Sequence, residues 1–181
     1  MQKESSAEQK KLMYDLGIQG GLLLAIISIL STVASNQLSN MTFKVVAGLT
    51  ALVAAIVIYI VFNKKFKAQN QGYMSFKQGM TIGTIITAIS TFISGIFSYI
   101  YPLYLDKGMW DRQIHSTIQT LQGYGLSEDQ VDQAVQQIKN MKDPAFYATS
   151  VLQGMLWSFI FFIAILAIVC AIQKKQKTLL D

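Results

Sequence analysis

Uncharged stretches divide this chain into four long apolar segments separated by polar ones. Residues 16–35, 45–62, 80–105 and 149–172 contain no Asp, Glu, Lys, Arg or His. A helix rises about 1.5 Å per residue, so roughly 20 apolar residues cross a hydrocarbon core about 30 Å thick. Inside lipid every backbone polar group needs a partner within the protein, which a helix supplies. The pattern therefore predicts four membrane-spanning helices.

Composition supports the membrane interpretation. The 181 residues are 52% hydrophobic and 14% charged, whereas soluble domains carry about 25% charged residues. A buried helix of a soluble bundle needs a polar face, and segment 45–62 lacks one. A single cysteine excludes an internal disulfide. We therefore expect one all-α, polytopic membrane domain over residues 1–181, with four transmembrane helices and an extracytoplasmic helical hairpin between the third and fourth.

The distribution of basic residues predicts the orientation. Ten of the 15 Lys and Arg residues would share one side of the membrane, in the N-terminal tail, the loop 63–79 and the C-terminal tail. The other side has Lys44 and four residues spread over 106–148. Because cytoplasmic loops carry the excess of Lys and Arg, both termini are expected in the cytoplasm. A cleaved secretory signal is the alternative for the first segment, since residues 33–35 loosely fit a small-residue cleavage site.

Three lysines, Lys64, Lys65 and Lys67, directly follow the second segment. They would lie beside anionic head groups, each attracted by about 1 kcal/mol. They could form a site for anionic lipids, although such clusters more often act only as the anchor on the positive side. The net charge of +5 is accordingly interpreted as a topology signal, and no nucleic-acid partner is expected.

The outer loop 106–148 has helical periodicity of its own. Its first helix is expected to place these apolar residues on one face, which is also the candidate interaction face: Trp110, Ile114, Ile118 and Leu121. A second helix begins at Ser127, where Gln130 completes a capping box, and Asp143 with Pro144 opens the fourth spanning helix. We expect the hairpin to dock mainly on its own bundle or lie at the outer surface, with Trp110 as its anchor. A protein partner is the alternative.

The third segment carries a narrow stripe of small and hydroxyl residues: Gly79, Gly83, Thr87, Ser90 and Ser94. Small residues let membrane helices approach closely, and hydroxyls can bond across the contact. The stripe is therefore expected to be a helix-packing face. A polar groove for a lipid or a small solute is the alternative.

No residue pattern indicates catalysis or a cofactor. Metal binding needs converging ligands, but the only histidine, His115, and the only cysteine, Cys170, would lie on opposite sides of the bilayer. Neighbours of His115 on a helix do not face it, so a catalytic group is not favoured. Phosphate and dinucleotide motifs are absent from the sequence. We expect no enzymatic activity, metal or cofactor.

Short motifs occur in a characteristic order along the chain. Two spanning segments, a lysine-rich loop leading into Gly72-Tyr73-Met74-Ser75-Phe76, and a third segment ending in Tyr101-Pro102 precede Gly-Leu-Ser-Glu-Asp-Gln at 125–130 and Met-Lys-Asp-Pro at 141–144. This layout resembles a family of small bacterial four-helix membrane proteins known only as a domain of unknown function. The resemblance implies four spans and the bacterial inner membrane, and it implies no catalytic residue.

Two functions stay open at this point. The first is a non-enzymatic structural or interaction component of the membrane, in contact with lipids and with a protein partner or a second copy of the chain. The alternative is a small channel or carrier for a neutral or lipid-like solute, because the spanning segments carry none of the ionisable groups that proton and ion pathways need.

The predicted orientation can be tested by cysteine labelling. A single cysteine introduced within 106–148 should react with a membrane-impermeant maleimide in intact spheroplasts, because the positive-inside rule places this loop outside. A cysteine within 63–79 serves as the control and should react only after lysis. The opposite pattern would reverse the orientation.

Overall fold

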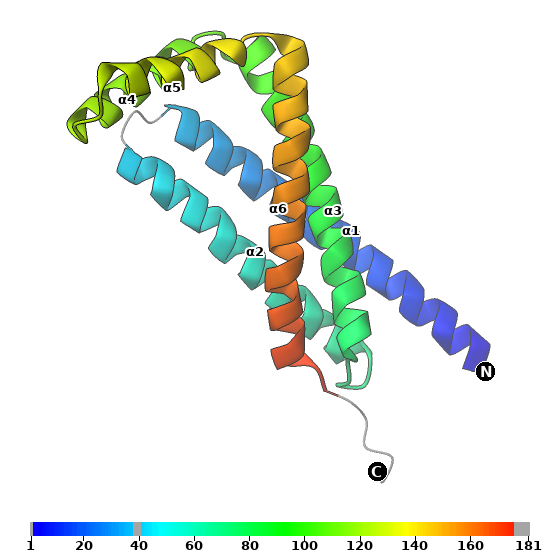
Figure 1. Cartoon of the computed structure of the whole chain (residues 1–181). Helices are drawn as coiled ribbons and strands as arrows, with labels where there is room; N and C mark the ends of the chain where they lie inside the picture. Colours follow the sequence, from blue (N-terminus) through cyan, green and yellow to red (C-terminus); the bar gives the residue numbers. More distant parts are fainter. Residues whose placement is uncertain (1, 38–40, 176–181) are drawn as a thin grey trace.

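Helices form almost the whole of the described structure. The computed structural model describes residues 2–37 and 41–175, with side chains for 7–37 and 45–175. Its elements are α1 (Gln2–Gln37), α2 (Met41–Gln69), α3 (Phe76–Ile100), the π-helical turn η1 (Tyr101–Leu105), α4 (Met109–Gly123), α5 (Glu128–Asn140) and α6 (Pro144–Gln173) (Figure 1). No strand is found in these two ranges, so the expected all-α class is confirmed.

Four of these helices are long and apolar enough to cross a membrane. The candidate spans are Ala7–Gln37, Val45–Gln69, Phe76–Leu105 and Pro144–Gln173, and each contains one of the four uncharged segments. At most 33% of the most apolar stretch of each span is buried inside the protein. Outward-facing apolar side chains are expected where the surrounding solvent is lipid. The chain is thus a multi-pass membrane protein.

Side-chain caps begin three helices. At α3, Gln78 Oε1 accepts a hydrogen bond from the Ser75 backbone N–H at 2.8 Å, and the Gln78 N–H donates to Ser75 Oγ at 3.2 Å. At α5, Gln130 Oε1 accepts from the Ser127 backbone N–H at 3.2 Å. At α6, Asp143 accepts from the backbone N–H two residues later at 2.9 Å. These caps satisfy N–H groups that have no partner within a helix, and they confirm the predicted starts at Ser127 and Asp143.

Pro102 widens the end of α3. Proline has no N–H and its ring crowds the preceding turn. The chain at η1 therefore takes a π turn, in which the Asp106 N–H donates to the Tyr101 carbonyl at 2.8 Å. This turn ends the third span and leads directly into α4.

Glycines let α3 approach both α1 and α6. A Cβ added at Gly83 would lie 2.1 Å from Leu166 Cδ1, and one added at Gly17 would lie 2.6 Å from Ile85 Cγ2. Both distances are far inside van der Waals contact, so only glycine fits these positions without rearrangement. Side chains of the neighbouring helix therefore pack directly on the glycine backbone.

Polar contacts close one end of the bundle by joining α2 to α6. Asn63 is 1% exposed, and its Nδ2 donates to Gln173 Oε1 at 2.9 Å. Lys67 Nζ donates to the Gln173 carbonyl at 2.9 Å, and Met74 pairs with Lys175 through two backbone hydrogen bonds of 2.9 Å. α2 and α6 meet at this end and diverge toward the hairpin formed by α4 and α5 (Figure 1).

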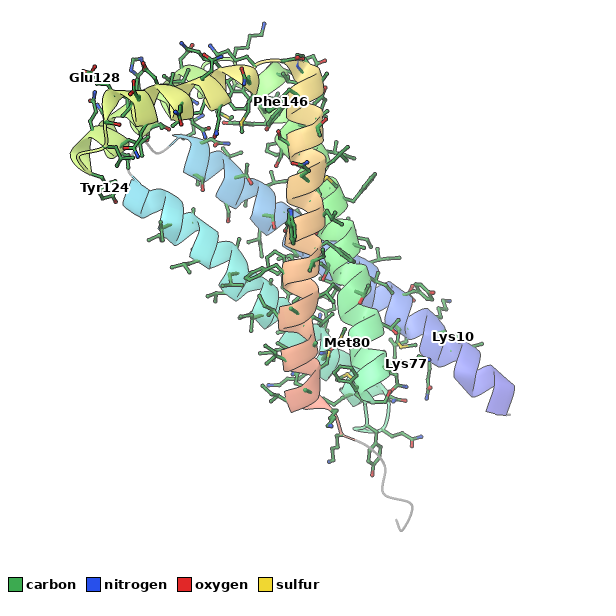
Figure 2. The ribbon with its side chains drawn as sticks, in the orientation of Figure 1. Lys10, Lys77, Met80, Tyr124, Glu128 and Phe146 are labelled. Carbon is green, nitrogen blue, oxygen red and sulfur yellow. The ribbon has the colours of Figure 1, made fainter. Side chains whose placement is uncertain are left out.

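The two ends of the molecule differ in their side chains. Figure 2 shows Lys10 and Lys77 toward the closed end, whereas Tyr124 and Glu128 lie on the hairpin at the other end. The lysine-rich segments expected on one side of the membrane therefore gather at one end of the bundle.

Replacing Gly83 with leucine should lower stability, because its side chain would overlap Leu166. Overpacking of this kind costs about 1–3 kcal/mol. Thermal unfolding in detergent measures the loss. Gly154→Leu is the matched control, since a Cβ there meets no atom within 4 Å. Equal melting temperatures for the two variants would contradict close packing at Gly83.

Candidate functional site

A groove of about 460 Å³ lies between the four long helices, in the half of the bundle nearer the hairpin. Hydroxyl side chains line much of it, and they come from three helices: Ser28, Ser31, Thr32 and Ser35 of α1, Ser90, Thr91, Ser94 and Ser98 of α3, and Ser158 of α6. Asn36 adds an amide. Among the described lining residues none carries a charge. The groove is therefore uncharged and rich in hydroxyls, although apolar groups make up the larger share of its surface.

Small residues make the groove possible. The α2 wall consists of Ala47, Gly48 and Ala51, and Gly154 lies on the α6 wall. A Cβ added at Gly48 or at Gly154 would meet no atom within 4 Å. Phe162 and Leu24 also line the groove and contribute apolar surface. The space is thus bounded by small side chains where the helices diverge.

Several of the hydroxyls donate to their own helix. Thr32 Oγ1 donates to the Ser28 carbonyl at 2.9 Å, and Ser90 Oγ donates to the Thr87 carbonyl at 3.1 Å. Ser94 Oγ donates to the Ser90 carbonyl at 2.6 Å. A hydroxyl that donates its proton still has lone pairs that can accept. The groove therefore offers acceptors to a neutral ligand that carries O–H or N–H groups.

The predicted stripe on α3 divides between two environments. Gly79 and Gly83 face α6, where an added Cβ would lie 2.9 Å from Cys170 Sγ and 2.1 Å from Leu166 Cδ1. Thr87 is buried, and its hydroxyl shares a 2.7 Å hydrogen bond with the Tyr59 hydroxyl of α2. The last two residues, Ser90 and Ser94, line the groove. The stripe thus contributes to packing at the closed end and to the groove near the hairpin.

The hairpin docks on the ends of the spanning helices through an apolar cluster. Tyr101, Met109, Trp110 and Ile138 form the buried centre of this cluster. The ring of Trp110 stands at 89° to that of Tyr147, with 5.0 Å between the ring centroids. Docking on the bundle agrees with expectation. However, Trp110 is 6% exposed, so it serves this internal contact rather than an open interaction face or the membrane boundary.

The rest of the candidate interaction face is half-buried. Ile114 packs against the cluster around Trp110, and Ile118 and Leu121 keep intermediate exposure. Part of the apolar side of α4 is therefore used within the protein, because α4 packs against α5 and against the bundle.

Asp106 connects three parts of the chain at the hairpin end. It pairs with Arg112 of α4 and accepts hydrogen bonds from the Tyr101 hydroxyl at 3.0 Å and from Gln37 Nε2 at 3.3 Å. The Arg112 hydrogen bond holds the pKa of the Asp106 carboxyl below its usual value. The same contact raises the pKa of Arg112. Asp106 therefore stays ionised and links α1, η1 and α4.

The lysine cluster has two kinds of environment. Lys64 and Lys65 are exposed, and Lys65 Nζ lies 4.7 Å from the centre of the Phe62 ring. Lys67 is half-buried and hydrogen-bonded to the end of α6. Lys64 and Lys65 are thus available to head groups, whereas Lys67 also ties two helices together.

His115 and Cys170 lie far apart along the bundle, as the sequence indicates. His115 belongs to the hairpin, and Cys170 is buried near the closed end beside Asn63, with 3.7 Å between Cys170 Sγ and Asn63 Nδ2. Within 2–37 and 41–175 no three His, Cys, Asp or Glu side chains gather in an arrangement that could hold a metal ion.

A model of the family described as "Protein of unknown function (DUF4199)" matches residues 16–175, from α1 to the end of the described chain. The chain belongs to this family. The resemblance to a domain of unknown function is thereby confirmed. Comparisons of this DUF4199 chain with curated proteins and with solved structures found no match. Its role has to be inferred from its own geometry.

Sequence reasoning identified the α3 side of the groove and missed the α1 side of this DUF4199 domain. Ser28, Ser31, Thr32 and Ser35 recur at helical spacing, which is the same signal that marks the stripe on α3. Gly154 and Ser158, four residues apart on α6, show it again. These stripes mark candidate inward faces on three of the spans, but the sequence does not show whether they meet in a groove.

Asp106→Asn should loosen the hairpin, because Arg112 would lose its anionic partner. A partly exposed ion pair contributes about 1 kcal/mol at most, so hydrogen exchange in 109–141 should accelerate up to about fivefold. Asp111→Asn is the control, since its ion pair with Lys142 lies on the surface.

The stabilisation that the Asp106–Arg112 ion pair gives the hairpin depends on pH. A carboxyl whose folded pKa is lowered stabilises the fold above its unfolded value, about 3.9, and that contribution disappears as the pH falls through the folded value. Protection of 109–141 should accordingly weaken in acid. Protection of 109–141 that is the same in the Asp106→Asn and Asp111→Asn variants, and the same at neutral and acidic pH, would contradict the role of Asp106.

Proposed function

We propose that this protein is a non-enzymatic membrane protein that binds a small neutral ligand, a lipid-like molecule or a solute, in the groove. The observation that carries the proposal is the hydroxyl lining, contributed by α1, α3 and α6 without a charged residue among the described lining residues. Burying hydroxyls in a bilayer is costly unless they find partners. Several of these hydroxyls already donate to carbonyls of their own helix, and a ligand that carries O–H or N–H groups can use their remaining lone pairs as acceptors.

The size of the groove favours a small ligand over a protein helix. Small-molecule sites measure about 300–1,000 Å³, and the groove of about 460 Å³ falls in this range. A 20-residue helix 30 Å long and 10 Å wide occupies about 2,400 Å³. A partner helix is therefore the weaker candidate, and a role in packing with proteins would use another surface.

Binding is also better supported than conduction. Toward the closed end, the Tyr59 and Thr87 hydroxyls are bonded to each other at 2.7 Å, and Asn63 is bonded to Gln173. A continuous pore would require both contacts to separate. The described lining residues include no acid or base, which supports a non-catalytic role.

For the membrane we propose the bacterial inner membrane, with both termini cytoplasmic. Lysines of α2, of α3 and directly after α6 gather at one end of the bundle, where Lys64, Lys65, Lys77 and Lys174 are found. The positive-inside rule assigns that end to the cytoplasm, and the hairpin then lies outside. Anionic lipids are the expected contacts of the exposed lysines.

Removing groove hydroxyls should release the ligand. The variant Ser31→Ala/Ser94→Ala/Ser158→Ala takes one hydroxyl from each of three walls. Each hydrogen bond contributes about 0.5–1.5 kcal/mol, so binding should weaken by about tenfold or more. Mass spectrometry of the molecules that co-purify in mild detergent measures the difference.

The control is Thr50→Ala/Thr81→Ala/Ser150→Ala. These hydroxyls also donate to their own helices, on α2, α3 and α6, but they lie outside the groove lining. The control should keep the bound molecule. Wild-type protein that carries only bulk lipid, or the same bound molecules in both variants, would contradict ligand binding in the groove.

A further inference from the structure

The groove opens sideways between α2 and α6. These helices are joined at the closed end through Asn63 and Gln173, which are bonded at 2.9 Å, and they diverge toward the hairpin (Figure 1). At the level of the groove, Gly48 of α2 and Gly154 of α6 are both exposed, and an added Cβ at either would meet no atom within 4 Å. We call the gap at these two glycines the lateral mouth.

The surroundings of the lateral mouth are those of a lipid-facing surface. Val45, three residues before Gly48 on the same side of α2, is 50% exposed. Trp157 and Phe161, three and seven residues after Gly154 on the same side of α6, are 70% and 55% exposed. Exposed apolar side chains on spanning helices contact hydrocarbon. A molecule that passes the mouth therefore moves from acyl chains to hydroxyls over a short distance.

A second groove provides an internal comparison. It lies between α1 and α2, has a volume of about 590 Å³, and Thr50 is the one polar residue among its described lining residues. Such a surface can accept acyl chains, but it offers almost nothing to a head group. Hydroxyls are thus concentrated in one of the two grooves.

The charge distribution argues against an anionic phospholipid as the ligand of this site. The described lining of the hydroxyl groove has no cation, whereas Lys64, Lys77 and Lys174 lie at the opposite end of the bundle. An anionic head group in the groove would lose its hydration without gaining a counter-charge. A neutral hydroxylated head group meets no such penalty, because serine and threonine hydroxyls can both donate and accept.

We infer that the ligand is a neutral lipid with a hydroxylated head group, of the acylglycerol type, that enters through the lateral mouth. Its head group bonds to hydroxyls such as Ser94 and Ser158, and its acyl chains leave between Gly48 and Gly154 into the bilayer. This inference rests on the proposed function and adds the class of ligand and its route.

Photocrosslinking with a diacylglycerol that carries a diazirine in an acyl chain tests the route. The protein is placed in phosphatidylcholine nanodiscs with a small fraction of this probe, or of an equivalent phosphatidylglycerol probe. Crosslinks from diacylglycerol should concentrate on 47–51 and 151–162, and the phosphatidylglycerol probe should label these segments at least fivefold less.

Closing the mouth supplies the second measurement. Gly48→Leu/Gly154→Leu adds two side chains where the structure has open space, so the fold should persist, and labelling of both segments should fall at least fivefold. Gly123→Leu is the control, because this glycine also has open space around it but lies on the hairpin. Its labelling should match that of the wild type.

The outcomes separate this inference from the proposed function. Even labelling along the apolar faces of α2 and α6, or labelling unchanged in the double variant, would overturn the lateral route. If a neutral molecule still co-purifies and is lost on removal of the groove hydroxyls, ligand binding stands and the ligand is a soluble solute that arrives from the hairpin side. If nothing co-purifies and the mouth is not labelled, both proposals fail.

Discussion

Direct contact of side chains with glycine backbone on α1 and α3 holds this bundle together. Gly17 and Gly21 of α1 lie under Ile85 and Ile89 of α3, and Gly83 of α3 lies under Leu166. Lipid tails are as apolar as leucine, so hydrophobic burial does not draw spanning helices together, whereas close van der Waals packing does. The glycines supply that packing, and α3 becomes the central helix that contacts both α1 and α6.

The groove lies where α2 separates from α6 (Figure 1). Along α3 the residues that face the interior change from Gly79 and Gly83 to Ser90 and Ser94. At the first pair α6 packs directly on the backbone, and Asn63 joins α2 to α6 nearby. Beyond the hydrogen bond between Tyr59 and Thr87, α2 separates from α6, whereas α3 and α6 stay in close contact at Gly95 and Met155 (Figure 1). Hydroxyls and small residues line the space that α2 leaves. One end of the bundle thus provides stability and the other provides a binding surface.

The hairpin completes the open end without closing the groove. Its apolar residues pack around Trp110 and Tyr147, and two ion pairs, Asp106 with Arg112 and Asp111 with Lys142, lie at its edges. These contacts bury Trp110 and use part of Ile114, whereas Ile118 and Leu121 on the same predicted interaction face keep intermediate exposure.

The sequence by itself determined which segments span the membrane, where the helices after Ser127 and Asp143 begin, and to which family the chain belongs. These properties depend on local composition and on residues a few positions apart, which caps and apolar periodicity encode directly. The tertiary structure alone decided that Thr87 packs while Ser94 lines a groove, that Trp110 is buried, and that Gly154 faces open space. Those outcomes depend on the angles and distances between helices far apart in the chain, and a stripe of small residues is compatible with either close contact or a cavity.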